Sequence, residues 1–169
     1  MTLSHPDLWD LTFNPEEDSQ KFLEWVRPIM PRHRARSTAI LQVPGVNMTD
    51  SGTPSLSLMS LSSNAAVAEA LGTPDLSMHR WRGNIHFDGA PAWAEFEWVG
   101  KTLQIGSAEF RVRKPVERCN ATTVDPETGE KDYDMLTTLN AQFGHQNFGV
   151  TIVVTKAGEI AVGDTIRVL

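Results

Sequence analysis

The sequence predicts a mainly β fold of the α+β class, in which a barrel-like sheet carries a few flanking helices. Its strand-like segments are short and separated by turn residues, and two of them form a clear hairpin between Lys101 and Lys114. Helix-like spacing of apolar residues occurs in only a few segments. A parallel, doubly wound sheet would need strands that alternate with helices, so this order favours a barrel-like sheet.

The first fifty residues predict one helix and one strand. Asn14 and Pro15 are typical of a helix start, and the apolar spacing continues to about Arg27, where Pro28 stops it. Residues 37–43 then have the composition of a strand, closed by a Pro-Gly pair.

A strand and a helix follow. Residues 55–60 alternate small polar and apolar side chains, as a half-buried strand does. Ser62 or Ser63 is a suitable N-cap for a helix that runs to Leu71, with Gly72 just past its end.

The hairpin is the best-defined element of the sequence. Lys101–Ile105 and Ala108–Lys114 flank a Gly-Ser turn, and the second segment alternates apolar and charged residues. Because Pro115 lacks an N–H, we expect the chain to leave the sheet there and to place Cys119 on the loop beyond its edge. Three aromatic residues just before the hairpin are expected to pack in the core: Trp93, Phe96 and Trp98.

The last third predicts a turn, a helix and short strands. Asp125–Gly129 has the composition of a turn, and Asp134–Phe143 has helix-like spacing. Three strand-like segments complete the chain, at 150–154, 160–162 and 166–169.

Composition excludes several classes of protein. The 169 residues suit one domain, and the net charge of −6 argues against general nucleic-acid binding, which depends on excess Lys and Arg. No apolar run approaches the ~20 residues that span a bilayer, and the N-terminus lacks the pattern of a signal peptide. The single cysteine is compatible with a reducing compartment. We therefore expect a cytoplasmic protein that binds neither nucleic acid nor membrane.

Cys119 is the first candidate for chemistry. A cysteine reacts or binds metal as the thiolate, which the neighbouring Arg118 favours and Glu117 opposes. The alternative is a buried cysteine that acts only as a small apolar residue.

Arg80 and Arg82 form a second candidate site. In an extended backbone, side chains two residues apart point the same way, so both guanidinium groups would line a wall for an anion. The alternative is a surface turn with solvated arginines. A third basic segment, with Arg32, Arg34 and Arg36, would suit a phosphate group or form a solvated loop.

The segment around Cys119 resembles the signature of the MOSC domain family, named for the C-terminal part of molybdenum cofactor sulfurase. Arg118-Cys119 is followed by Thr-Thr-Val-Asp-Pro-Glu-Thr-Gly at 122–129. The resemblance covers roughly residues 50–169. Other similar segments occur in the family's order: 80–85, 94–95, 98–106, 148–150 and 158–164. It implies a MOSC-type, β-barrel-like mixed sheet. Gly83 departs from the pattern, since relatives commonly carry proline there, and we expect a looser backbone.

The resemblance also implies a cofactor and a reaction. Cys119 would be a ligand of molybdenum in the molybdenum cofactor, and Arg118 would stabilise the thiolate. Such a protein would be an oxidoreductase that reduces N-hydroxylated compounds with electrons from a partner protein. The other residues implied in cofactor binding are Arg80, Arg82, Asn84, Thr122 and Thr123.

Two alternatives remain open. Cys119 could hold a persulfide in a sulfur carrier that serves the assembly of metal–sulfur centres, with a sulfur donor or acceptor as partner. In the other, the domain is purely structural and Cys119 is buried.

The resemblance divides the chain into an N-terminal extension, 1–49, and a MOSC domain, 50–169. Relatives carry a larger N-terminal β-domain, so we expect the extension to be a reduced remnant of it. The five histidines form no zinc-binding pattern, and the sequence contains neither a Gly-x-Ser-x-Gly elbow nor a Gly-Lys-Ser phosphate loop.

Overall fold

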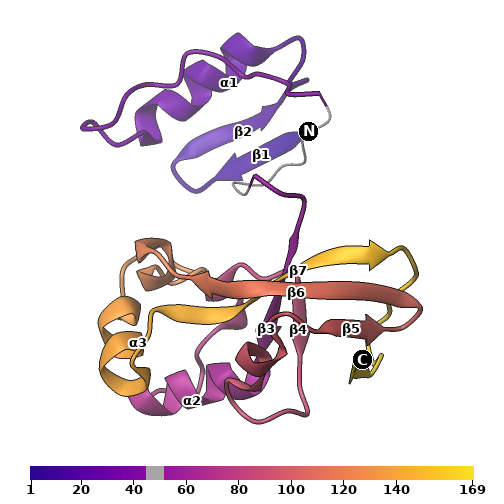
Figure 1. Ribbon diagram of the computed structural model, residues 1–169. Helices are drawn as coiled ribbons and strands as arrows, with labels where there is room; N and C mark the ends of the chain where they lie inside the picture. Colours follow the sequence, from indigo (N-terminus) through magenta and orange to yellow (C-terminus); the bar gives the residue numbers. More distant parts are fainter. Residues whose placement is uncertain (45–51) are drawn as a thin grey trace. The chain divides into compact units, whose positions relative to one another are not determined.

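The computed structural model describes residues 1–44 and 52–169 and divides the chain into two compact units, Met1–Met48 and Thr49–Leu169 (Figure 1). Among these residues, no helix is long and apolar enough to cross a membrane.

The first unit is a hairpin with one helix. Strands β1 (Thr2–His5) and β2 (Leu8–Thr12) pair antiparallel, and helix α1 (Ser19–Val26) continues into the short 3-10 helix η1 (Arg27–Ile29). Leu11, Phe13 and Trp25 form its small core. The sequence analysis did not predict this hairpin.

Two expectations for the first unit are wrong in detail. Asn14 does not cap α1, because its carbonyl and side chain bond within the turn at 14–18, and Asp18 is the N-cap residue. Residues 37–43 form no strand, since they are almost all exposed and pair with no described strand. Without a partner for its backbone groups, a strand-like sequence does not become a strand.

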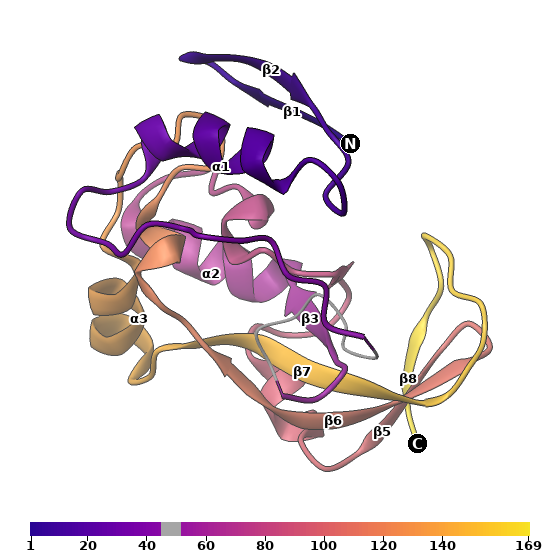
Figure 2. The same ribbon diagram turned by 90° about the horizontal axis from the view of Figure 1, so that it is seen from above.

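The second unit is built on a curled, mixed sheet with the strand order β4-β3-β7-β6-β5-β8 (Figure 2). Only the β3–β4 pair is parallel. This confirms the predicted barrel-like mixed sheet with flanking helices. The strands are β3 (Leu56–Ser60), β4 (Ile85–Phe87), β5 (Thr102–Ile105), β6 (Ala108–Glu117), β7 (Asn147–Lys156) and β8 (Ile166–Val168).

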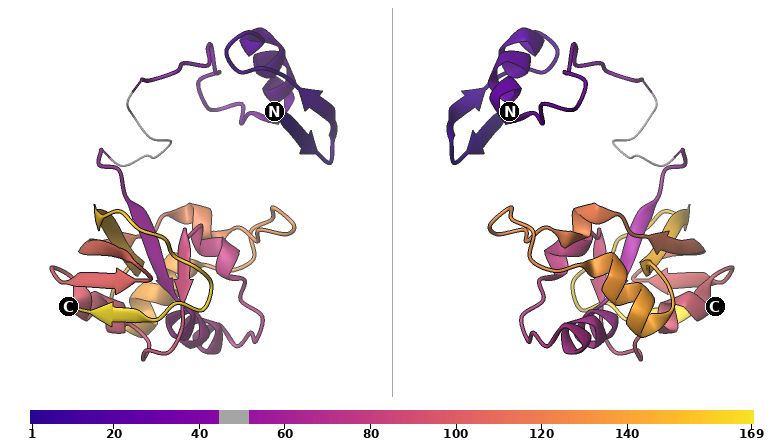
Figure 3. Two further views of the ribbon diagram at one scale, coloured as in Figure 1. Left: turned by 90° about the vertical axis from the view of Figure 1, so that its right-hand side faces the viewer. Right: turned by 90° about the vertical axis from the view of Figure 1, so that its left-hand side faces the viewer.

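Helices α2 (Leu61–Leu71) and α3 (Met135–Phe143) lie together beside the sheet (Figure 3). The N-cap of α2 is Ser60 rather than the expected Ser62 or Ser63, because the helix starts directly after β3 and both of those serines lie inside its first turn. Gly72 follows its last residue as expected. The Ser60 side chain accepts from the Ser63 N–H to cap α2, Asp134 caps α3, and Gly72 and Gly144 end the two helices in the left-handed region. Three 3-10 helices complete the unit: η2 (Met78–Trp81), η3 (Ala94–Trp98) and η4 (Asn120–Thr123).

Two apolar clusters form the core of this unit. One lies among the strands and includes Leu58, Phe110 and Ile152, with Phe96 and Trp98 packed against it. The other joins α2 and α3 to the sheet, and its buried members include Met59, Trp81, Met135 and Phe148. Trp93 packs against this second cluster, so the three aromatic residues are core residues as expected.

Strand β6 continues past Pro115, contrary to expectation. Pro115 pairs with Val150, and the strand ends at Glu117 after register irregularities on both sides of the proline. The missing N–H is tolerated because β5 pairs with β6 only along Ala108–Arg111, so β6 has one ladder at Pro115 rather than two. Cys119 still lies just beyond the strand. The expected strand at 160–162 is absent, and those residues form a loop and turn.

Candidate functional site

The Cys119 thiol is exposed and unpaired on the loop between β6 and η4. Its residue has extended backbone angles and stands directly before the first turn of η4. The alternative of a buried, inert cysteine is therefore wrong for this chain.

Arg118 is partly buried and bonds only to neutral acceptors. Its Nε and Nη2 donate to the carbonyl of Phe148 at 3.0 and 2.7 Å, and Nη1 donates to the carbonyl of Trp81 at 3.0 Å. Nη2 also lies 3.0 Å from the Met59 sulfur, and the guanidinium group stands over the stacked Trp81 and Phe148 rings. The strand β7, η2 and the core thus hold this cation in place.

The Arg118 charge has no carboxylate partner within ion-pair distance in the described residues. Burial lowers the pKa of Arg118 to about 10, and the charge of Cys119 acts in the opposite direction.

Thr122 and Thr123 are buried, and their hydroxyl groups bond to the loop itself. The Thr122 hydroxyl donates to the Cys119 carbonyl at 3.0 Å, and the Thr123 hydroxyl donates to the Asn120 carbonyl at 2.6 Å. These two side chains shape the cysteine loop from inside.

Arg80 lies beside this loop, but the terminal nitrogens of its guanidinium group already have partners within the protein. Nη1 donates to the Thr122 carbonyl at 2.9 Å, and Nη1 and Nη2 together form a two-pronged ion pair with Asp132. The Arg80 side chain is 2% exposed, and its Nε has no partner in the part of the chain that the structure describes. Tyr133 packs below the guanidinium group.

The expectation that Arg80 and Arg82 point the same way is wrong. Residues 78–81 form the 3-10 helix η2 rather than extended backbone, and Arg82 follows in the left-handed region with φ of 52°. Arg80 is consequently buried and Arg82 exposed, without a described partner for its guanidinium group. A non-glycine residue at positive φ is uncommon outside turns and functional sites.

Asn84 joins the loop to β3. Its Oδ1 accepts from both the N–H and the hydroxyl of Ser57, and its own N–H donates back to Ser57. The side-chain amide NH₂ of Asn84 remains free among the described residues.

The structure leaves no room for a side chain at Gly83. A Cβ there would lie 2.4 Å from the Met59 Cγ and 3.2 Å from the His86 Nε2, so the space is already filled. Met59 therefore takes the room that a larger residue would need at this position.

The comparisons with known proteins agree with this arrangement. A family model described as MOSC domain matches residues 48–167. The chain belongs to the MOSC domain family.

Its relatives include proteins named molybdenum cofactor sulfurase. The chain is 33% identical over 99 residues to that of Drosophila ananassae, and this match covers 56% of the chain and 12% of the relative. The protein of Drosophila grimshawi is 32% identical over 115 residues, covering 63% of the chain and 15% of the relative. The chain thus matches only a small part of these longer relatives.

Two solved structures share the fold. YiiM from Geobacillus stearothermophilus superposes with a TM-score of 0.51 at 17% identity, covering 68% of this chain and 53% of YiiM. The YuaD protein of Bacillus subtilis has a TM-score of 0.50 at 16% identity, covering 66% of this chain and 61% of YuaD.

Sequence reasoning missed two residues of the MOSC site, Asp132 and Met59. Asp132 lies outside the family signature at 118–129, and nothing in its local sequence indicates that it pairs with Arg80. Met59 looked like an ordinary apolar residue of β3. Asp132 contacts Arg80 across 52 residues of sequence, and Met59 contacts Arg118 across 59. Local sequence patterns cannot predict such contacts.

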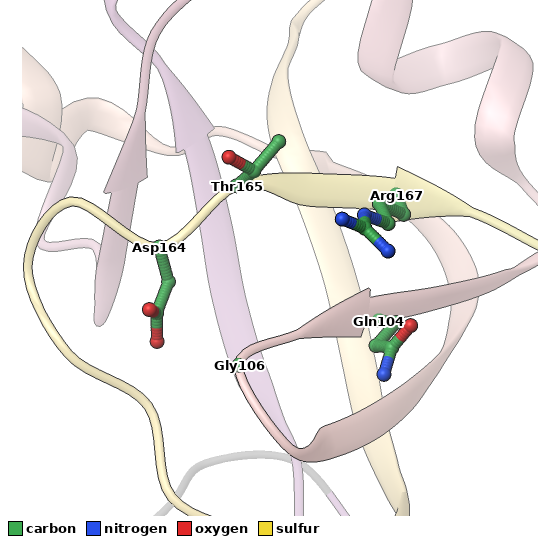
Figure 4. Close-up of a pocket in the computed structure, with 5 residues that line it drawn as sticks. All are labelled: Gln104, Gly106, Asp164, Thr165 and Arg167. Carbon is green, nitrogen blue, oxygen red and sulfur yellow. The ribbon is translucent and has the colours of Figure 1, made fainter.

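A polar cavity of about 240 Å³ lies elsewhere on the MOSC sheet and contains none of the predicted site residues (Figure 4). It is lined by Gln104, Gly106, Asp164, Thr165 and Arg167. The described residues include no group of three or more His, Cys, Asp or Glu side chains that could hold a metal ion.

Proposed function

We propose that this MOSC domain binds the molybdenum cofactor and that the Cys119 thiolate is a ligand of its metal. One observation carries the proposal: an exposed thiol follows directly after a partly buried cation that no carboxylate neutralises. An anion beside Arg118 would remove the cost of the unpaired charge. A thiolate bound to an anionic cofactor supplies that charge.

The residues fit the metal end of such a cofactor. A thiolate is a soft ligand and suits a metal that the cofactor already holds through sulfur. In the part of the chain that the structure describes, the Arg82 guanidinium group and the Asn84 amide have no partner and could donate to the organic part. The buried Arg80 Nε, which lacks an acceptor, is a third donor beside the loop.

The remaining predicted residues act differently. Hydrogen bonds within the protein already use the side chains of Thr122, Thr123 and Arg80. Their role would be to hold the cysteine loop. Arg118 would balance the negative charge of the bound cofactor. Bound cofactor would supply two-electron redox chemistry, and the chain would orient it and set its charge.

The relatives named molybdenum cofactor sulfurase support an association with this cofactor by family. For the reaction, we propose reduction of N-hydroxylated compounds, with a partner protein as the electron donor. Such a step takes up two electrons and two protons, breaks the N–O bond and releases water.

Metal analysis of protein from cells that make the cofactor tests the binding. We expect about one molybdenum per chain in the wild type and loss of the metal in Cys119→Ser, since a hydroxyl is a poor ligand for a sulfur-rich metal centre. Asn120→Ser is the matched control, because it changes the next exposed residue of the loop and leaves the thiol intact. It should retain molybdenum.

Other results would point elsewhere. Sulfane sulfur on Cys119 without metal would contradict the proposal and favour a sulfur carrier. Protein with neither metal nor sulfane sulfur would contradict both. Reduction of an N-hydroxy compound by metal-loaded protein, with a reduced viologen as donor, separately tests the proposed reaction.

A further inference from the structure

The polar cavity of about 240 Å³ lies at the edge of the sheet, where β5 and β8 meet the loop before β8 (Figure 4). Gln104 and Arg167 are directly opposite each other in the antiparallel β5–β8 ladder, so their side chains lie on the same face of the sheet. Asp164 and Thr165 come from the loop just before β8, and Gly106 comes from the turn after β5. Two segments far apart in the sequence therefore build one cavity.

Hydrogen bonds hold the loop before β8 against the β5–β6 turn. The Glu159 N–H donates to the Ser107 hydroxyl at 2.8 Å, and the Ser107 N–H donates to the Glu159 carbonyl at 3.1 Å. The Asp164 Oδ2 accepts from the Ala161 N–H at 2.7 Å. Gly106 has a φ of 56°, and a Cβ there would lie 2.7 Å from the same Asp164 oxygen. The protein itself thus fixes the wall of the cavity before any ligand binds.

The cavity carries two opposite charges that do not neutralise each other. Arg167 and Asp164 both line it, yet no ion pair joins them, and no carboxylate in the described part of the chain pairs with Arg167. The Arg167 guanidinium group and the Gln104 amide also lack a hydrogen-bond partner among residues 1–44 and 52–169, as does the Asp164 Oδ1. The cavity therefore presents N–H donors and, separately, a carboxylate oxygen.

We propose that this cavity binds a small zwitterion of the α-amino acid class. The carboxylate of the ligand accepts from Arg167 in the two-pronged geometry that guanidinium groups favour, and Gln104 supplies a further donor. The ammonium group of the ligand donates to Asp164. The cavity shares no residue with the cysteine site, so this inference does not depend on the proposed function.

The lining and size of the cavity argue against other classes of ligand. Its five lining residues are polar or glycine, so an apolar molecule would bury little apolar surface there. A phosphate dianion would face the carboxylate of Asp164, and a bare metal cation would face the guanidinium group of Arg167. The volume of about 240 Å³ is below the ~300–1,000 Å³ of most ligand pockets, which indicates a small occupant.

Amide chemical shifts of the ¹⁵N-labelled full chain test this binding. Glycine, L-alanine and L-serine supply the complete head group with a small side chain, whereas acetate and ethylammonium each supply only one of its two charges. We expect saturable shifts at residues 104–106 and 164–167 with the amino acids. Acetate and ethylammonium should each bind about tenfold more weakly, because each lacks one charge-assisted hydrogen bond.

Two variants test the assigned groups. Arg167→Gln and Asp164→Asn should each weaken amino-acid binding by about tenfold, because each removes one charge of the cavity. The amide oxygen introduced by Asp164→Asn can still accept from the Ala161 N–H, so the loop should keep its position. The matched control is Arg113→Gln, which removes an exposed arginine of β6 outside the cavity and should bind as the wild type does.

The absence of a saturable shift with all three amino acids would overturn the proposal. Acetate binding as tight as that of the amino acids would also overturn it and indicate a simple anion site, and an equal loss in Arg113→Gln would indicate a general charge effect. If a variant fails to fold, the comparison of amino acids with acetate and ethylammonium on the wild-type chain still decides the question. Because this assay involves neither Cys119 nor molybdenum, its failure is separate from failure of the proposed function.

Discussion

Arg80 and Arg118 lie in neighbouring parts of the fold and differ in how their charge is balanced. Arg80 is almost fully buried and forms a two-pronged ion pair with Asp132. Arg118 is partly buried and donates only to two carbonyl groups and a thioether. Sequence reasoning assigned both arginines to the cofactor, but only one of them has charge that the protein leaves unbalanced.

This difference indicates that the two arginines have different roles. A paired arginine stabilises the structure around a site, since its field is largely cancelled by the carboxylate. An unpaired arginine that is held in one position can attract a neighbouring anion. The adjacent residue here is Cys119. The predictions below test this distinction.

The largest effect is expected for stability when Arg80 is removed. Arg80→Met leaves Asp132 without its partner and the Thr122 carbonyl without its donor, and should lower the free energy of unfolding by about 2–4 kcal/mol. Arg118→Met removes an unpaired charge together with its hydrogen bonds, so its cost should be clearly smaller. Urea unfolding of both variants at pH 7 measures the difference. Equal costs would show that the two arginines do not differ in this way.

A methyl group at Gly83 tests how rigidly Arg118 is supported. The added Cβ of Gly83→Ala would collide with the Met59 Cγ, and Met59 also contacts Arg118. We expect a loss of about 1–3 kcal/mol in the free energy of unfolding, typical of overpacking. In a double-mutant cycle, Met59→Ala should reduce the cost of Gly83→Ala, because it removes the colliding atom. Full additivity of the two substitutions would contradict the contact.

The reactivity of Cys119 tests the unpaired charge itself. Arg118→Gln should slow alkylation by iodoacetamide at pH 7 several-fold, because the cation next to the attacking sulfur is lost. Arg113→Gln is the matched control, since Arg113 is an exposed arginine of β6, the strand that precedes Arg118. A similar decrease in both variants would mean that general surface charge, rather than Arg118, controls the thiol.

The sequence predicted much of this fold because many boundaries depend on local chemistry. The β5–β6 hairpin, the end of α2 at Gly72, and the position of Cys119 just beyond β6 follow from alternation, capping and turn residues. Failures occurred where a distant partner decides. Residues 37–43 lack a described strand to pair with, and Pro115 stays in β6 because its second neighbour is absent there.

The site divides in the same way. The exposed cysteine beside an arginine was predicted from adjacent residues. The orientation of Arg80 and Arg82 was not, because η2 and the left-handed Arg82 depend on packing of Trp81 into the core. The partners Asp132 and Met59 come from distant segments and carry no sequence signal of their own.

Glu95 is a buried acid without a charged partner in the described residues, and its substitution should change stability least. It is fully buried in η3, and the side chain that bonds to it is the neutral Ser63 hydroxyl, at 3.0 and 3.2 Å. Burial raises the pKa of Glu95, against the hydrogen bonds from its own N–H and from Ser63. Between the ordinary carboxyl pKa and this raised value, the folded state binds more protons than the unfolded state, so stability falls as pH rises.

Glu95→Gln should remove that part of the pH dependence. We expect the variant to lose less stability than the wild type between pH 4 and neutral pH, with Glu97→Gln, an exposed position of the same helix, as the control. Urea unfolding across this range measures the slope. If Glu95→Gln follows the wild-type curve, burial of this unpaired carboxyl group has no measurable effect on the pH dependence of stability.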